Sequence, residues 1–247
     1  MNVWIVCIVG AYLIGSIPFG VIIGRARGVN ILRKGSMNPG ATNVARLLGR
    51  PLGAVCLILD MIKGAAPVLA AWSIFGLLDR PPASTDPEVA VLTHPEMWLW
   101  LAVACAAVAG HMCSPLLAFR GGKGVATGFG AMVAMWPVLT FPALAAIVVW
   151  YGVLRFTRYV SAASILAAVS LPLGYAVSVL PRDPAVLPNP WSDSLEQVLT
   201  AWPPLAVTAL MAVVVVYKHR SNIARIRRGQ EPQVRGSARR GDVGGSD

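Results

Sequence analysis

Long apolar stretches alternate with short polar segments along almost the whole chain. They cover residues near 2–24, 51–78, 97–119, 124–139, 141–156, 161–180 and 198–217. A helix needs about 20 mostly apolar residues to cross a bilayer. The pattern therefore predicts an all-α fold, a polytopic membrane helix bundle with about seven transmembrane helices.

The fourth and fifth stretches are short and follow each other from about 124 to 156. Two prolines, Pro137 and Pro142, interrupt them, and proline cannot continue the hydrogen-bond ladder of a helix. We expect two short helices joined by a turn near 136–142. A single long kinked helix is the alternative.

Composition agrees with a membrane protein, because 56% of the 247 residues are hydrophobic and 13% are charged. A soluble domain with so few charges cannot cover its apolar core. The four cysteines form no Cys-x-x-Cys pair. We therefore expect small core residues rather than a zinc site or a disulfide framework, and neither a metal nor another cofactor is indicated.

The positive charges predict the orientation of the bundle. Of the 21 Lys and Arg residues, 18 fall in four segments that share one predicted side, namely 25–50, 120–123, 155–160 and 218–247. The loops predicted on the other side, 79–96 and 181–197, hold only Arg80 and Arg182. Because Lys and Arg gather on the cytoplasmic side, we predict the N-terminus outside and the C-terminus in the cytoplasm.

The charge pattern also bears on the two ends of the chain. The first apolar stretch has its basic cluster after it rather than before it, which indicates a retained helix and not a signal peptide. We expect a single membrane-embedded catalytic domain over residues 1–228. Residues 229–247 are rich in Gly, Arg and Ser, and we predict a disordered basic cytoplasmic tail against anionic lipid.

Small polar and basic residues gather on the predicted cytoplasmic side. The first cluster runs from Gly35 to Asn43 and is followed by Arg46. Glycine-rich backbone can approach an anion closely and offer it N–H donors, although Ser, Asn and Thr are also typical of turns and helix caps. The polar side chains of this cluster are Ser36, Asn38, Thr42 and Asn43.

A glycine-rich segment, Gly121-Gly122-Lys123-Gly124, leads directly into an apolar stretch. A helix beginning there would place free N–H groups and its positive end beside Lys123, which favours a phosphate-binding loop. The Walker A spacing is absent, so a nucleotide hydrolase is disfavoured. His111 lies shortly before this segment and, taken alone, is more typical of a hydrogen-bonded interior histidine.

Two further clusters follow on the same predicted side. Helical spacing places Arg158, Ser161 and Ser164 on one face, and it does the same for His219, Asn222 and Arg225. Either cluster alone is typical of cations that anchor a helix at the membrane surface. Together with the earlier clusters, they indicate an anion site on one face of the membrane.

Asp60 and Lys63 are charged residues inside the second apolar stretch. Their spacing allows them to pair on one helix face, and charges at membrane depth are costly and often functional. A functional site and a purely neutralising pair both stay open. Several motifs are missing, including His-x-x-x-x-Asp after any of the three histidines, Gly-x-Ser-x-Gly and His-Glu-x-x-His.

Together these segments resemble the PlsY family, the integral-membrane acyl-phosphate:glycerol-3-phosphate acyltransferases of bacteria. The matching pieces are Gly15 to Gly20, Gly35 to Asn43, Asp60 to Gly64, Gly110-His111, Phe119 to Thr127, Arg158 to Ser164 and His219 to Glu231. Their order and spacing are specific as a set. Met37 stands where the family often has a small residue, and the basic tail looks like an addition.

The resemblance implies a reaction. An acyl phosphate gives its fatty acyl group to the 1-hydroxyl of glycerol 3-phosphate, which yields 1-acyl-glycerol 3-phosphate (a lysophosphatidic acid) and inorganic phosphate. This is the first step of phospholipid biosynthesis. The implied partners are the two substrates, the lipid bilayer and an upstream enzyme that forms the acyl phosphate, with no nucleic acid. The implied location is the bacterial inner membrane.

The resemblance also implies residue roles. The residues implied to bind and orient glycerol 3-phosphate are Ser36, Arg46, Ser161, His219 and Asn222. The residues implied to hold the acyl phosphate are Gly121, Gly122 and Lys123. The rest of the substrate-binding set is Asn38, Thr42, Asn43, His111, Arg158 and Ser164, of which the first four shape the loops. The residues expected to act in catalysis are Lys123, His219, Asn222 and Ser36. The general base is either His219, a residue type with a suitable unperturbed pKa, or a substrate phosphate.

Two other functions share some of these features. A transporter of phosphorylated metabolites would also have several helices and a basic anion site, but its polar groups should lie near the middle of the membrane. A lipid-binding scaffold would need the basic patches and not the Ser, Asn and His positions.

Overall fold

The computed structural model describes residues 2–77, 92–179 and 202–234. Every regular element in these ranges is a helix. They are α1 (Asn2–Gly15), α2 (Phe19–Ala26), α3 (Ala41–Leu48), α4 (Arg50–Phe75), α5 (His94–Met112), the 3-10 helix η1 (Pro115–Leu117), α6 (Val125–Val133), α7 (Thr140–Thr157), α8 (Val160–Val179), α10 (Trp202–Lys218) and α11 (Arg220–Arg227).

The all-α membrane bundle is confirmed, and the count of seven spans stays a prediction. Five segments of the described chain are long and apolar enough to cross a membrane, and the bent pair α10 and α11, at 54° to each other, makes a sixth if it is one span. The remaining predicted span is α6, which has only 9 residues. At about 1.5 Å per residue, α6 covers less than half of a bilayer core about 30 Å thick.

The predicted interruption after the fourth apolar stretch is present. The helix α6 ends at Val133 and α7 begins at Thr140. The hydroxyl of Thr140 donates a hydrogen bond of 2.8 Å to the carbonyl of Val133 across the turn. Pro142 lies in the first turn of α7, where a missing N–H costs no intrahelical bond. The chain therefore forms two helices here and not one kinked helix.

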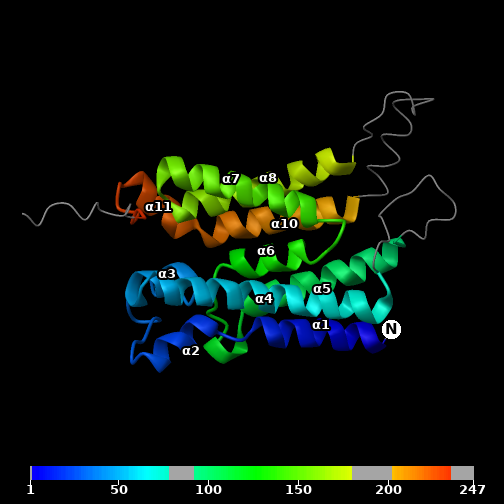
Figure 1. Ribbon diagram of the computed structural model, residues 1–247, viewed down its shortest axis with the longest axis horizontal. Helices are drawn as coiled ribbons and strands as arrows, with labels where there is room; N and C mark the ends of the chain where they lie inside the picture. Colours follow the sequence, from blue (N-terminus) through cyan, green and yellow to red (C-terminus); the bar gives the residue numbers. More distant parts are fainter. Residues whose placement is uncertain (1, 78–91, 180–201, 235–247) are drawn as a thin grey trace, which may run out of the picture.

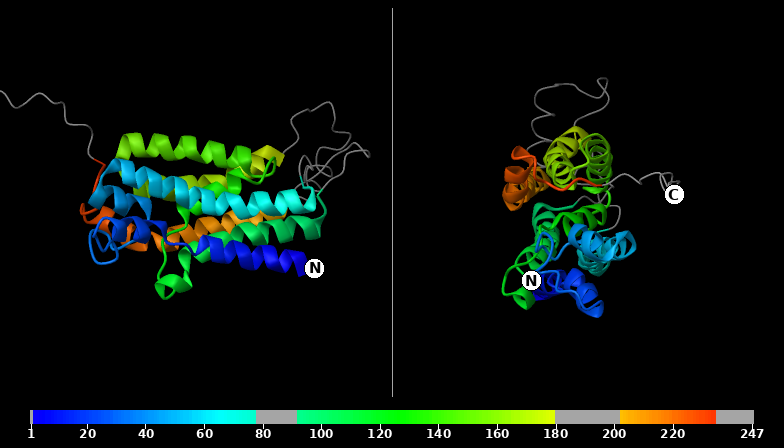
Figure 2. Two further views of the ribbon diagram at one scale, coloured as in Figure 1. Left: turned by 60° about the horizontal axis from the view of Figure 1, so that its bottom comes forward. Right: turned by 90° about the vertical axis from the view of Figure 1, so that its left-hand side faces the viewer.

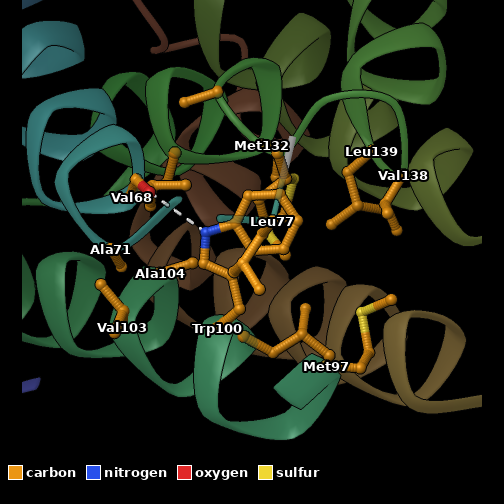
Figure 3. Packing of buried hydrophobic residues seen from close by; sticks show 14 of the residues in the cluster. Val68, Ala71, Leu77, Met97, Trp100, Val103, Ala104, Met132, Val138 and Leu139 are labelled. Carbon is orange, nitrogen blue, oxygen red and sulfur yellow. Dashed lines mark hydrogen bonds between the residues drawn. The ribbon is translucent and has the colours of Figure 1, made fainter. Parts of the chain in front are cut away.

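Trp100 lies at the centre of the main apolar core (Figure 3), which contains residues of α1, α4, α5 and α6 together with Ala143 of α7 and Tyr175 of α8. Its side chain is fully buried, and its indole N–H donates a hydrogen bond of 3.1 Å to the carbonyl of Val68 on α4. Met132 of α6 and Leu77 after α4 pack around the ring. This core fixes α4, α5 and α6 relative to one another, and α6 starts at the glycine-rich loop.

Glycines bring neighbouring helices into backbone contact. A Cβ at Gly64 of α4 would lie 2.0 Å from the carbonyl oxygen of Thr127 on α6. A Cβ at Gly15 of α1 would lie 2.0 Å from the carbonyl oxygen of Ala107 on α5. Small residues permit this close packing of helices in membranes.

The helices α7, α8, α10 and α11 form a second group beside the first one (Figure 2). In that group α8 packs between α7 and α10, and α10 also contacts α5 of the first group. Figure 1 shows α2, α3 and α11 at one end of the bundle and the N-terminus of α1 at the other. The predicted polar clusters on these elements therefore gather at one end, while most of the predicted outer loops lies outside the described residues.

The packed structure continues past the predicted domain boundary at residue 228. Glu231 is 9% exposed, and the N–H of Val234 donates a hydrogen bond of 2.9 Å to the carbonyl of Arg158. Residues 229–234 thus belong to the folded unit, because a buried carboxylate there holds partners on two helices. The rest of the predicted tail, 235–247, lies outside the described residues.

Candidate functional site

Glu231 is the centre of a buried polar network. Its Oε1 atom accepts hydrogen bonds from the hydroxyl of Ser161 at 2.9 Å and from the amide of Asn222 at 2.6 Å. Its Oε2 atom accepts one from Nε of Arg225 at 2.7 Å. Burial acts to raise the pKa of the Glu231 carboxyl, but these three hydrogen bonds and the charge of Arg225 outweigh it and lower the pKa. Glu231 is therefore ionised and joins α8, α11 and the C-terminal segment.

Lys123 enters this network from the other group of helices. Its Nζ atom donates a hydrogen bond to Oδ1 of Asn222, so Asn222 bridges Lys123 and Glu231. Burial lowers the pKa of Lys123 to about 8, with Arg225 and Arg46 adding to the effect and Glu231 opposing it. Arg46, on α3, contributes to the lowered pKa because its positive charge disfavours the charged form of the lysine.

The backbone N–H groups of the two glycines before Lys123 form hydrogen bonds within the protein. The N–H of Gly121 donates to the carbonyl of Met112 at 3.2 Å, and the N–H of Gly122 donates to that of His111 at 3.0 Å. These two donors are already used within the protein. A helix leaves the N–H groups of its first turn without intrahelical acceptors, so the donors suited to an anion are those at the start of α6.

Glycine is required at both positions because the loop lies directly on α5. A Cβ at Gly121 would lie 2.0 Å from the carbonyl oxygen of His111, and one at Gly122 would lie 2.1 Å from Nε2 of the His111 ring. Gly124 follows with φ of +76°, in the left-handed region that favours glycine. The loop is thus held in one place, and it turns the chain into α6.

Asn43 and Asn38 build the loop that precedes α3. The Asn43 amide accepts a hydrogen bond from the N–H of Ser36 at 2.9 Å and donates to the carbonyl of Ile31 at 3.0 Å. Asn38 accepts one from the N–H of Gly40 at 2.9 Å. Asn43 of α3 is thereby connected to Ile31 and Ser36 of the preceding loop. The side chains of Ser36, Thr42 and Arg46 are exposed at the same end of the bundle.

Of the remaining predicted residues, Ser161 belongs to the Glu231 network, and His219, Ser164 and Arg158 have other contacts. His219 is 3% exposed, and its Nδ1 atom lies 2.8 Å from the carbonyl of Val215. Ser164 accepts a hydrogen bond of 3.3 Å from the indole N–H of Trp150, which links α8 to α7. The backbone of Arg158 holds Val234, while its side chain is exposed. Ser161 contacts Glu231, whereas Ser164 and Arg158 have their described contacts elsewhere.

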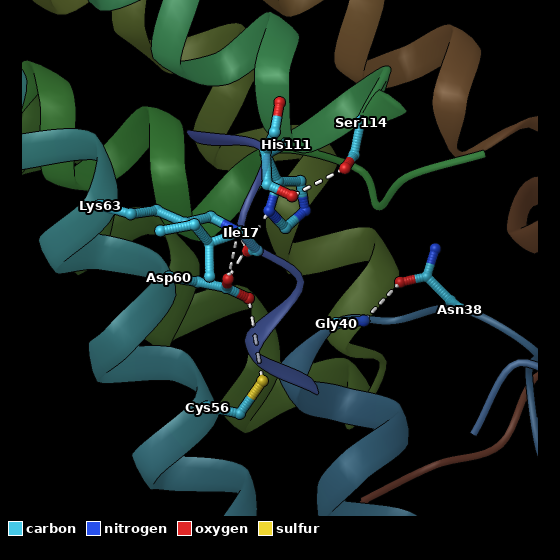
Figure 4. A network of polar contacts seen from close by, with 9 residues as sticks. Ile17, Asn38, Gly40, Cys56, Asp60, Lys63, His111 and Ser114 are labelled. Carbon is cyan, nitrogen blue, oxygen red and sulfur yellow. Dashed lines mark hydrogen bonds and ion pairs between the residues drawn. The ribbon is translucent and has the colours of Figure 1, made fainter. Parts of the chain in front are cut away.

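Asp60 and Lys63 do form the predicted ion pair (Figure 4). Oδ1 of Asp60 lies 2.7 Å from Nζ of Lys63 and 3.6 Å from Nδ1 of His111. Lys63 also donates a hydrogen bond of 2.8 Å to the carbonyl of Ile17, between α1 and α2. The pair is therefore part of a larger cluster that includes His111.

Comparison with known proteins identifies the family. The model of the glycerol-3-phosphate acyltransferase family matches residues 5–229. The crystal structure of PlsY, an integral membrane glycerol 3-phosphate acyltransferase, in its glycerol 3-phosphate form has a TM-score of 0.72 and 33% identity, over 94% of this chain and 96% of that one. The chain belongs to the PlsY family. The resemblance inferred from the motifs is thereby confirmed.

Other PlsY relatives show the same full-length similarity. The glycerol-3-phosphate acyltransferase of Geobacter sulfurreducens is 38% identical over 90% of this chain and 92% of its own length. The one from Desulforamulus reducens is 40% identical over 93% and 94%. The lysophosphatidic acid form of the PlsY crystal structure matches with a TM-score of 0.70.

Glu231 is the residue of this network that sequence reasoning missed, since it appeared only as the last residue of a matching segment. A signal existed in its surroundings. It is an acidic residue that closely follows Arg225, Arg227 and Arg228. An acidic residue among cations next to a membrane helix indicates an ion-pair or hydrogen-bond partner nearby. The sequence does not reveal that Ser161, which lies 70 residues away, is one of the partners of Glu231.

Proposed function

We propose that this PlsY protein transfers a fatty acyl group from an acyl phosphate to the 1-hydroxyl of glycerol 3-phosphate. The products are 1-acyl-glycerol 3-phosphate and inorganic phosphate. The reaction belongs to the bacterial inner membrane, where an enzyme that forms acyl phosphate supplies the donor. PlsY relatives are named for this acceptor, and a related crystal structure was solved in glycerol 3-phosphate and lysophosphatidic acid forms.

One observation carries the proposal: Lys123 donates a hydrogen bond to Asn222, and Asn222 donates one to Glu231. The positive charge of Arg46 contributes to the lowered pKa of Lys123. These hydrogen bonds join both groups of helices at the end where α3 and α11 lie (Figure 1). Both substrates carry a phosphate, and preorganised cations stabilise charge on phosphate and acyl oxygens. The adjacent apolar helices suit a long acyl chain, while the polar acceptor arrives from water.

Residue roles follow from the two groups of side chains. Lys123 and the first turn of α6 hold the donor phosphate and stabilise charge on its leaving oxygen. The acceptor phosphate pairs with Arg46, and the groups that orient its hydroxyl are Ser36, Ser161, His219 and Asn222. Glu231 touches neither substrate in this scheme. It fixes the amide of Asn222 and the hydroxyl of Ser161 in the orientations that the acceptor needs.

The transfer is a direct displacement at the acyl carbon. The oxygen of the 1-hydroxyl attacks the carbonyl carbon of the acyl phosphate and forms the ester bond. The bond between that carbon and the phosphate oxygen breaks, and the phosphate leaves with the electron pair. The hydroxyl proton passes either to His219 or to a substrate phosphate. Nδ1 of His219 faces the carbonyl of Val215 at 2.8 Å, so the ring donates there and Nε2 is left to accept a proton.

The first experiment measures phosphate release by purified protein given a long-chain acyl phosphate, with and without glycerol 3-phosphate. We expect release that requires the acceptor and falls at least 100-fold in Lys123→Ala. Lys34→Ala removes an exposed lysine at the same end and should leave the rate within about twofold. Folded protein that releases no phosphate in response to the acceptor contradicts the acyltransferase proposal, and uptake into sealed vesicles then tests the transporter.

The identity of the base is tested separately. His219→Gln keeps a polar side chain but cannot accept the proton as imidazole does. If His219 is the base, kcat should fall about 10²- to 10⁴-fold, the range typical of general-base catalysis. Turnover within threefold of the parent enzyme assigns the proton to a substrate phosphate instead.

A further inference from the structure

A buried cluster of Asp60, Lys63 and His111 lies beside the glycine-rich loop, and the residue roles given under the proposed function do not use it. Asp60, Lys63 and His111 are 2%, 3% and 8% exposed. A single oxygen of Asp60 lies 2.7 Å from Nζ of Lys63 and 3.6 Å from Nδ1 of His111 (Figure 4). Charges this deep in a membrane protein are costly to keep, so a chain that retains them gains something by it.

His111 links this cluster directly to the loop. Its carbonyl accepts the hydrogen bond from the N–H of Gly122 at 3.0 Å. Nε2 of its ring lies where a side chain at position 122 would begin, 2.1 Å from an ideal Cβ. The imidazole is therefore held between Asp60 on one side and Gly122 on the other. Any movement of the ring changes the position of the residue that precedes Lys123.

The segment that leads into the glycine-rich loop begins at Ser114, which is hydrogen-bonded to the break between α1 and α2. The hydroxyl of Ser114 donates a hydrogen bond of 2.7 Å to the carbonyl of Ser16. Lys63 donates one of 2.8 Å to the next carbonyl, that of Ile17. The segment from 114 to 122 thus has both ends fixed, and Asp60 and Lys63 are connected to each of them.

We propose that Asp60 is a positioning residue for the phosphate-binding loop. Through its ion pair with Lys63 and its contact with His111, it sets where Gly122, Lys123 and the start of α6 lie. This inference rests on the proposed function, since it assigns the loop to the acyl phosphate. Asp60 itself touches no substrate and exchanges no proton.

The competing explanation is an ion pair that only helps α4 to fold. Removing one partner of a buried pair leaves an uncompensated charge, whereas replacing both by apolar residues is often neutral for stability. The double variant Asp60→Val/Lys63→Met separates the two explanations, because it removes both charges and the contact with His111. A folding role predicts normal kinetics in any variant of normal stability.

The kinetic test measures KM for the acyl phosphate and KM for glycerol 3-phosphate. For the double variant we expect a donor KM at least 10-fold higher and an acceptor KM within threefold, with a thermal midpoint close to that of the parent. Lys63→Arg keeps the charge pair and should retain a donor KM within threefold. Cys56→Ala removes a side chain whose sulfur lies 3.8 Å from the same carboxylate and should change neither KM beyond twofold.

A second readout follows the loop without any substrate. Hydrogen exchange detected by mass spectrometry reports the N–H groups of Gly121 and Gly122, which are bonded to Met112 and His111. In the double variant and in Asp60→Asn, the peptide covering 119–124 should exchange faster than in the parent or in Cys56→Ala. Parent-like exchange together with a parent-like donor KM in these variants overturns the proposal. Parent protein without acceptor-dependent phosphate release refutes the proposed function, and the exchange data still decide whether Asp60 positions the loop.

Discussion

At the scale of single residues, the candidate site depends on one carboxylate that meets no substrate in the proposed reaction. Glu231 accepts hydrogen bonds from Ser161, Asn222 and Arg225, and Asn222 in turn receives Lys123. Each of these groups has a fixed orientation because Glu231 occupies the middle. A buried network of this kind is rigid when it is complete and unfavourable when one member is missing.

Replacement of Glu231 by alanine should therefore damage folding as well as activity. A buried polar group left without its hydrogen-bond partner costs about 1–3 kcal/mol, and the buried donor groups of Ser161 and Asn222 would both lose this acceptor. We expect a clear drop in the thermal midpoint in detergent and at least a 100-fold loss of acyl transfer. Gln233→Ala, in the exposed part of the same segment, is the control. A Glu231→Ala enzyme as stable and active as this control contradicts the central role of Glu231.

Lys123 gives the reaction a predictable pH dependence. Burial lowers its pKa to about 8, so the free enzyme carries the positive charge below that pH and loses it as the pH rises. Phosphate monoesters have a second pKa near 6, so the substrates stay ionised across this range. We expect kcat/KM to fall on the alkaline side with a midpoint near 8, since this parameter reports the free enzyme.

The variant Lys123→Arg tests that assignment. Guanidinium stays charged at all accessible pH values, so the alkaline fall near pH 8 should disappear even though the rate is lower. An unchanged midpoint in the arginine enzyme assigns the fall to another group.

The stability of the fold depends on pH in the opposite direction to the activity. Because the pKa of Lys123 is lowered, burying its charged form destabilises the folded protein below about pH 8. This penalty decreases as the pH rises from about 8 toward 10.5, the usual pKa of lysine.

At the scale of helices, the sequence predicts the elements better than it predicts their contacts. The stretches 124–139 and 141–156 are separable because Pro137 and Pro142 interrupt a helix. The pairing of α4 with α6 was not, because lipid-facing and core-facing positions in a membrane are both apolar. Val148 is 70% exposed while Ala143 of the same helix is fully buried, and hydropathy does not distinguish them. Polar residues stand out in such a chain, which explains why Lys123, Ser161 and Asn222 of the Glu231 network were among the predicted candidates.

Replacing glycine by alanine should change the stability of the protein differently at Gly64, where α4 contacts α6, and at Gly10 of α1. A Cβ at Gly64 would collide with the backbone of Thr127, whereas one at Gly10 in α1 would have nothing within 4 Å. Gly64→Ala must push α6 away and should destabilise the protein by about 1–3 kcal/mol. Gly10→Ala should be neutral or slightly stabilising, because alanine favours helix over glycine. Thermal unfolding of the two variants side by side measures the difference, and equal midpoints contradict the close packing.

At the scale of the whole molecule, the site lies between two groups of helices and belongs to neither. Lys123 and Arg46 come from the first group, and Asn222 with Ser161 comes from the second. Such a junction cannot be read from hydropathy, although the charge pattern does place its parts on one side. The α2–α3 segment and α11 lie at the same end of the bundle, opposite the start of α1 (Figure 1), in agreement with their shared predicted side.

The side of the membrane itself is a prediction that labelling can decide. With 18 of the 21 Lys and Arg residues in the four segments of one side, the positive-inside rule places the site in the cytoplasm, where both phosphorylated substrates are available. A single cysteine at exposed Arg228, in a chain whose own cysteines are replaced, should react with a membrane-impermeant thiol reagent only after cells are opened. A cysteine at exposed Val3 of α1 should react in intact cells. Labelling of position 228 in intact cells would reverse the orientation and move the site to the outer face, where acyl phosphate made in the cytoplasm does not reach it.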